Sequence, residues 1–253
     1  MPNEPAACAL CLQPAILRSS HIVPEFCYKG MYDVKHRAIA IDPLEDDGSS
    51  YVQKGHRCYL LCDNCEQHLN EQYEKPFLVS WYRRGVLSDL AQHKALVVRG
   101  LDYASFKLLH LSILWRASCC QPSWGADGLR PWAKERLRKM LLDQDPGAEW
   151  EFPVIASAVD DQRGGIWESL VEPPYGIRLY GHHGFLTTYA GCHWSVLVSA
   201  HQCLEIADIR LSPSGSLPVV VGPPQTPRRH AMWKEIYDKY KASRQQATNN
   251  EST

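Results

Sequence analysis

The chain has 253 residues, of which 45% are hydrophobic and 22% are charged, and its formal net charge is −1. These values are typical of a folded protein with one large or two modest domains. A nearly neutral chain lacks the global basic field of a non-specific nucleic-acid-binding protein, so any nucleic-acid contact must come from a local patch. The start of the chain lacks the regions of a secretory signal, and no apolar stretch reaches about 18 residues, so we expect a cytoplasmic protein without a membrane span.

Two C-x2-C pairs lie in the first part of the chain, Cys8 with Cys11 and Cys62 with Cys65. Each pair turns the backbone so that two thiolates face one ion, and two pairs complete a tetrahedral site. Because cysteines in a reducing cytosol are more often metal ligands than disulfides, we predict one structural Zn²⁺ bound by these four residues. The remaining cysteines lack metal-ligand spacing and are predicted to be buried free thiols. They are Cys27, Cys58, Cys119, Cys120, Cys192 and Cys203.

The elements of residues 1–82 follow from composition and spacing. Residues 41–56 are rich in Asp, Gly and Ser and predict an exposed loop. Residues 59–61 are a short apolar strand that enters the second cysteine pair. From Glu66 onward Leu69, Tyr73 and Phe77 recur every four residues, which predicts a helix with one buried face. Pro76 is expected to kink or restart this helix.

Residues 83–145 are expected to be helical. Asp102 is a suitable N-cap for a helix whose Leu108, Leu111 and Trp115 form an apolar stripe. Pro131 is expected to begin a further helix, which the DQDPG segment at 143–147 ends.

From 150 to 222 short β-branched and aromatic runs alternate with Gly, Pro and Asp, which predicts an antiparallel sheet or a small barrel. Thr226 and Pro227 are expected to open a last helix, followed by a disordered tail at 247–253. The fold class is therefore α+β, with a zinc-bound head at 1–82 and a helical plus β-rich domain at 83–253. The four histidines of the β-rich part are expected to be ordinary polar residues rather than a second metal site; they are His182, His183, His193 and His201.

The segments CALCLQPAILRSSHIVP, at 8–24, and CDNCEQHLNEQYE, at 62–74, resemble the HNH, or ββα-metal, endonuclease family. The resemblance covers about residues 8–75. In that family a first C-x2-C precedes a strand that carries a catalytic histidine, and the second pair lies at the start of a helix. The resemblance implies a ββα-metal head and a DNA endonuclease that uses Mg²⁺ or Mn²⁺.

Residue by residue, His21 matches the general base of the family. Ser20 stands where the family usually has a metal-binding Asp or His, and Glu66 stands where it commonly has His or Asn. Asn70 and Glu74 follow Glu66 at intervals of four on one helix face. Their oxygen atoms are of the kind that Mg²⁺ or Mn²⁺ binds, so these three residues are the expected ligands of the catalytic ion.

The chain also departs from the family pattern. A serine at position 20 is a poor Mg²⁺ ligand, and Arg57, preceded by His56, stands where the middle asparagine of the family is expected. An arginine there can bind the scissile phosphate, so His56 and Arg57 are the candidate phosphate-binding residues. The alternatives are a catalytically degenerate zinc module that binds nucleic acid or a protein partner, and an enzyme whose site lies at 175–205. Residues 83–253 would recognise the target or a partner, and the layout resembles bacterial proteins of anti-phage defence.

Overall fold

The computed structural model describes residues 4–41, 49–120, 124, 126, 128–198 and 201–222, and the chain up to Val221 forms one compact unit. The helix expected from Thr226 and the tail at 247–253 lie outside the described residues. The helical elements are η1 (Glu25–Met31), α1 (Asp63–Leu69), η2 (Asn70–Glu74), α2 (Lys75–Phe77), η3 (Leu78–Arg83), α3 (Val86–His93), α4 (Tyr103–Cys119), α5 (Pro131–Asp143) and η4 (Leu204–Ile206). The strands are β1 (Ala6–Ala7), β2 (Pro14–Ala15), β3 (Arg18–His21), β4 (Ala38–Ile41), β5 (Ser49–Val52), β6 (Arg57–Leu61), β7 (Ala95–Val98), β8 (Val154–Val159), β9 (Glu172–Leu179), β10 (His182–Tyr189), β11 (Cys192–Leu197) and β12 (Leu217–Gly222).

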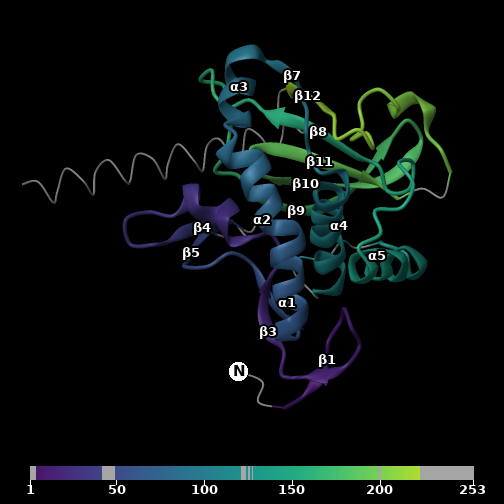
Figure 1. The fold of residues 1–253 in the computed structure, drawn as a ribbon. Coiled ribbons are helices and arrows are strands. Elements are labelled where there is room, and N and C mark those ends of the chain that lie inside the picture. Colours follow the sequence, from purple (N-terminus) through teal and green to yellow (C-terminus); the bar gives the residue numbers. More distant parts are fainter. Residues whose placement is uncertain are drawn as a thin grey trace, which may run out of the picture. The chain divides into compact units, whose positions relative to one another are not determined.

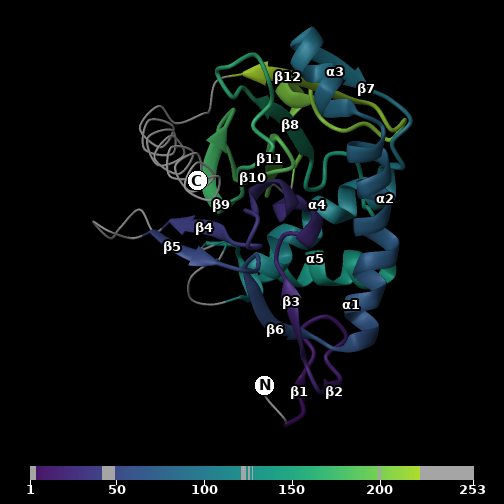
Figure 2. The same cartoon turned by 90° about the vertical axis from the view of Figure 1, so that its left-hand side faces the viewer.

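The described N-terminal part is built from three short antiparallel pairs, the 3-10 helix η1 and the helix α1. Strand β1 pairs with β2, β3 with β6, and β4 with β5, and α1 follows β6 directly (Figure 2). In the β3–β6 pair Ser20 lies opposite Cys58 and His21 lies opposite Arg57. The loop expected at 41–56 is partly wrong, because Ser49–Val52 pairs with Ala38–Ile41 as a hairpin. Residues 42–48 lie outside the described part of the chain.

A continuous helical run extends from Asp63 to Arg83 and includes two π-helical segments, Asn70–Glu74 and Leu78–Arg83. Pro76 lies between them. Proline has no backbone N–H and cannot complete the α-helical ladder, and wider π turns accommodate that loss without ending the helix. The expected buried face is confirmed, since Leu69, Tyr73 and Phe77 are each about 1% exposed.

The helical middle was predicted in most respects. Asp102 caps α4 by accepting a hydrogen bond from the Ser105 backbone N–H at 2.7 Å, and Pro131 is the first residue of α5. Every residue of α4 from Phe106 to Ser118 is buried, so this helix is enclosed on all sides rather than amphipathic. One prediction was wrong: Ala95–Val98 forms β7, because these residues pair with β12 far along the chain.

The expected sheet is confirmed, with antiparallel pairing of β7 with β12, β8 with β11, β11 with β10 and β10 with β9, and the class is mixed α+β. Six strands lie in the order β7-β12-β8-β11-β10-β9, and α4 lies against β9 and β11 (Figure 1). The segment 203–211, expected to be a strand, contains the 3-10 turn Leu204–Ile206 instead. Cys203 and Ile206 are both buried, and their spacing of three residues suits a helical turn better than a strand.

A single hydrophobic cluster joins the N-terminal part to the sheet. It includes Leu10 from the β1–β2 turn, Trp81 from the helical run, Trp115 from α4 and Trp194 from β11. The Trp81 indole N–H also donates to the Ala190 carbonyl oxygen at 3.1 Å. None of the helices in the described part of the chain has the length and apolar composition of a membrane span.

Candidate functional site: a cysteine cluster and the His21 centre

The two C-x2-C pairs come together as predicted. The four sulfur atoms of Cys8, Cys11, Cys62 and Cys65 all lie within 4.8 Å of one another, and the Cys11 and Cys62 sulfurs are 3.9 Å apart. Four thiolates at zinc–sulfur distances of about 2.3 Å in a tetrahedron are about 3.8 Å apart. The cluster therefore has the donor set and the dimensions of a structural zinc site.

Local backbone geometry explains why the sulfurs converge. Leu12 has a φ of 64° and its N–H donates to the Cys8 carbonyl at 2.8 Å, which closes a tight turn around the first pair. The Cys62 backbone N–H donates to the Cys8 sulfur at 3.3 Å. Burial raises the pKa of the Cys8 thiol, but N–H groups of Cys11, Cys62 and Leu10 outweigh it and lower that pKa to about 7. A thiol that ionises near neutral pH is suited to metal binding.

His21 is the last residue of β3, at the end of the β3–β6 pair that lies away from Cys62, and it is surrounded by groups of both charges. The Arg57 Nε–H donates to His21 Nε2 at 2.8 Å. The Glu25 carboxylate contacts the same nitrogen, and Tyr32 donates to its other oxygen at 2.7 Å. Nε2 can accept from Arg57 in the neutral imidazole and can donate to Glu25 in the imidazolium, so the two neighbours stabilise opposite protonation states.

Burial and the positive charge of Arg57 lower the pKa of His21, against an opposing effect of Glu25 and Glu74. The imidazole is therefore neutral at pH 7 and able to accept a proton. Its side chain is 16% exposed, so the ring is sheltered but not sealed from solvent. His21 and Arg57 were predicted site residues, whereas Glu25 was not, although it follows His21 at i+4.

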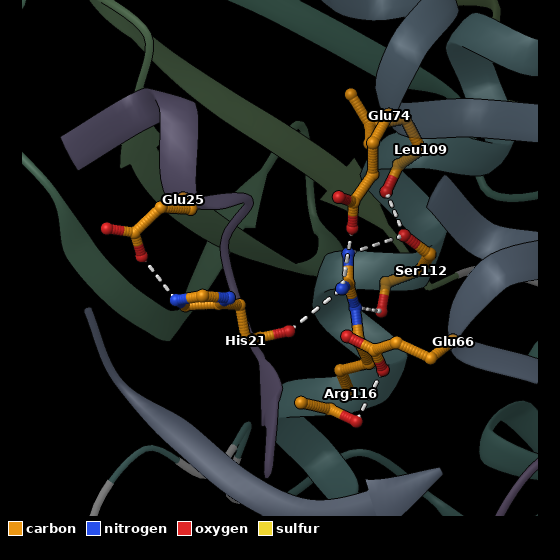
Figure 3. Close-up of polar contacts among 8 residues, drawn as sticks. His21, Glu25, Glu66, Glu74, Leu109, Ser112 and Arg116 are labelled. Carbon is orange, nitrogen blue, oxygen red and sulfur yellow. Dashed lines mark hydrogen bonds and ion pairs between the residues drawn. The ribbon is translucent and has the colours of Figure 1, made fainter. Parts of the chain in front are cut away.

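Arg116 of α4 donates a hydrogen bond to the backbone of His21 and so fixes the position of that residue. Its Nη1 donates to the His21 carbonyl oxygen and to Glu74 Oε1, both at 2.8 Å, and its Nη2 donates to the Ser112 hydroxyl at 3.2 Å (Figure 3). Its side chain is 1% exposed. Arg116 was not among the predicted site residues, although a lone arginine inside the apolar helical segment LSILWRASCC is a signal of a buried ion pair.

The expected ligands of a catalytic divalent ion are not arranged as such a site. The Glu74 carboxylate pairs with Arg116, and Glu66 accepts a hydrogen bond from the Ser20 hydroxyl at 2.5 Å. In Figure 3 the His21 ring points toward Glu25, whereas Glu66 and Glu74 lie on the other side, around Arg116. Among the described residues, neither Glu66 nor Glu74 belongs to a group of three or more His, Cys, Asp or Glu side chains placed to bind one metal ion. Asn70 is partly buried beside them.

Adjacent strand residues explain this separation. Ser20 and His21 are consecutive in β3, so their side chains lie on opposite faces of the strand. Ser20 therefore faces Glu66 of α1, while His21 faces Glu25 and Arg57. These residues do not fit a bound Mg²⁺ or Mn²⁺ as they stand, and we derive no chemical step through such an ion.

Two of the cysteines predicted to be free are paired. Cys58 of β6 and Cys120 at the end of α4 form a disulfide across 62 residues, with their Cα atoms 5.9 Å apart. Cys27, Cys192 and Cys203 are buried free thiols as expected, and Cys119 is a partly buried one. His56, a predicted phosphate-binding residue, stacks on Trp124, and its Nε2 lies 3.5 Å from the Cys120 sulfur.

Comparisons with known proteins return nothing at any level: no family model, no curated protein and no solved structure matches this chain.

Proposed function

We propose that this protein is an endonuclease that hydrolyses phosphodiester bonds in DNA, with His21 as the general base and Arg57 as the phosphate-binding cation. The observation that carries the proposal is the pairing of a sheltered, neutral imidazole with a guanidinium at 2.8 Å, at the end of a strand braced by a four-cysteine cluster. Phosphodiester hydrolysis requires a base for the attacking water and a positive charge for the phosphate, held rigidly together.

The contacts of His21 suggest how the site would act. In the absence of substrate, Arg57 donates to Nε2 of His21. A bound phosphate would take over the guanidinium, since charge-assisted pairs with phosphate are stronger than a hydrogen bond to a neutral imidazole. Nε2 would then be free to accept the proton of the attacking water, and the nearby Glu25 carboxylate would stabilise the imidazolium that forms.

A zinc ion at the four cysteines would have a structural role. Three of the ligands, Cys8, Cys11 and Cys62, lie in short turns or at a helix start that have little core of their own. Metal binding fixes such segments, and its free energy contributes directly to folding. The β3–β6 pair that carries His21 and Arg57 lies between the two halves of the cluster in sequence.

Cleavage of supercoiled and linear DNA tests the proposal, with Mg²⁺, Mn²⁺ or EDTA present in parallel reactions. His21→Ala should lower the rate about 100-fold or more, the usual loss on removing a general base, while zinc content is unchanged. His93→Ala is the matched control, because His93 is an exposed histidine on α3. Equal rates for the wild type and His21→Ala would refute the assignment of the base.

A second candidate function is a zinc module that binds DNA or a protein partner without cleaving it. The observation that favours it is the engagement of Glu66 by Ser20 and of Glu74 by Arg116, which leaves the resemblance to metal-dependent nucleases incomplete. If the wild-type chain cuts no DNA under any of the three conditions, this candidate replaces the nuclease. Loss of DNA binding in Arg57→Gln would then place the binding surface at the same residue, and unchanged binding would direct the search to residues 83–253.

A further inference from the structure

A second group of metal-type ligands lies beside the β3–β6 pair, apart from the four-cysteine cluster. One ligand nitrogen of His56 and the sulfurs of Cys58 and Cys120 all lie within 4.8 Å of one another. His56 directly precedes β6, and Cys58 is the second residue of that strand. Cys120 is the C-cap residue of α4 and reaches these two residues from a distant part of the sequence.

Two of these residues, His56 and Cys120, are held in place by contacts that do not depend on the others. The His56 carbonyl accepts a hydrogen bond from the Ile22 N–H at 3.1 Å, and its ring is parallel to that of Trp124 within 11° at 5.2 Å. Cys120 donates its N–H to the Arg116 carbonyl at 3.1 Å, at the end of a buried helix. The ligand side chains are therefore oriented before anything binds.

We propose that His56, Cys58 and Cys120 bind a second Zn²⁺ when the two cysteines are reduced. Imidazole nitrogen and thiolate sulfur are the donors that zinc prefers, and three protein ligands leave one tetrahedral position for water. A zinc ion with zinc–nitrogen and zinc–sulfur distances of about 2.0 and 2.3 Å in a tetrahedron holds those two atoms about 3.5 Å apart. The observed separation between His56 Nε2 and the Cys120 sulfur is 3.5 Å.

The backbone already permits both states of the cysteine pair. Two thiolates on one zinc ion lie about 3.8 Å apart, a separation that side-chain rotation can provide from Cα atoms 5.9 Å apart. The disulfide is then the oxidised, metal-free state of the site. In either state β6 is linked to the C-terminal end of α4, four residues beyond the arginine that holds the His21 carbonyl.

The test compares the zinc content of full-length variants purified with a phosphine reductant throughout. Cys120→Ser should contain one zinc per chain less than the wild type. Cys119→Ser is the matched control, because Cys119 is the adjacent cysteine and lies outside the group; it should retain the wild-type content. The comparison depends on the difference between variants, so zinc at the four-cysteine cluster does not affect it.

A measurement on the wild type avoids any folding defect of the variants. The reduced protein is alkylated with iodoacetamide before and after stepwise chelation, and each cysteine is followed by peptide mass spectrometry. Cys58 and Cys120 should be protected together in the metal-loaded protein and should become reactive together as one zinc ion is released. Equal zinc in wild type and Cys120→Ser would overturn the proposal. Recovery of Cys58 and Cys120 as free reactive thiols in the metal-loaded, reduced protein would overturn it as well.

Discussion

Replacing Arg116 with methionine should destabilise the protein severely. The guanidinium is 1% exposed, and its loss would leave the Glu74 carboxylate, itself only 16% exposed, without its cation. Removing one partner of a buried ion pair typically costs about 3–5 kcal/mol, because the remaining charge stays buried and uncompensated. The His21 carbonyl would also lose the hydrogen bond from Arg116 Nη1. Against a typical total stability of about 5–15 kcal/mol, this loss is a large fraction.

The double variant Arg116→Met/Glu74→Met separates the charge effect from the loss of packing. Apolar replacement of both partners removes the unpaired charge. The free energy of unfolding of the double variant should therefore exceed that of Arg116→Met alone by about 2 kcal/mol or more. Urea denaturation at constant zinc and reductant concentration measures the wild type, Arg116→Met, Glu74→Met and the double variant. Arg18→Met is the control, because the Arg18–Asp63 pair is 61% and 69% exposed, and exposed pairs contribute about 0–1 kcal/mol. Additive effects of the two single changes would refute the account of Glu74 as an ion-pair partner.

Three further outcomes follow from other parts of the structure. Cys62→Ser should lower the zinc content by one per chain and unfold the N-terminal part, as measured by elemental analysis and circular dichroism; unchanged zinc would rule out the four-cysteine site. Glu66→Gln should leave the metal dependence of DNA cleavage superimposable on that of the wild type, because its carboxylate is engaged by Ser20; a shift to higher metal concentration would restore it as a ligand. Burial lowers the pKa of His110 in the folded protein to about 3, whereas its ordinary pKa is near 6.5. Below pH 6.5 the unfolded chain therefore binds a proton that the folded chain does not bind. The free energy of unfolding falls as the pH falls through this range. Between pH 7 and pH 5 this loss is about 2 kcal/mol and should vanish in His110→Gln but persist in Tyr189→Phe, which loses only the hydrogen-bond partner.

The features that could be predicted from the sequence are those coded locally. The cap at Asp102, the buried face that includes Tyr73 and Phe77, and the short strands after residue 150 each depend on spacing within a few residues. The four-cysteine cluster was also predictable, although its halves are distant, because each C-x2-C pair makes its own turn and the zinc ligand count requires a second pair.

The features that could not be predicted depend on which distant segments meet. Arg116 contacts Glu74 across 42 residues of sequence, and Cys58 contacts Cys120 across 62. No spacing in the sequence predicts either contact. The strand β7 forms because β12 lies beside it, since a four-residue apolar run also suits a helix. At the His21 centre, the sequence indicated the residue types. Ser20 and His21 lie on opposite faces of β3, and this placement decides which side chains each of them contacts.

The helical run from Asp63 to Arg83 is fixed at its two ends by different means. Its first turn carries Cys65 of the four-cysteine cluster, and its last turns carry Trp81, whose indole N–H donates to Ala190 in the turn between β10 and β11. At about 1.5 Å per residue the run spans roughly 30 Å. Chelation would release only the first end, so amide hydrogen exchange should accelerate from Asp63 inward and decline toward Trp81, whose amides stay protected until the sheet itself opens. The gradient along one helix would then distinguish loss of the metal from global unfolding.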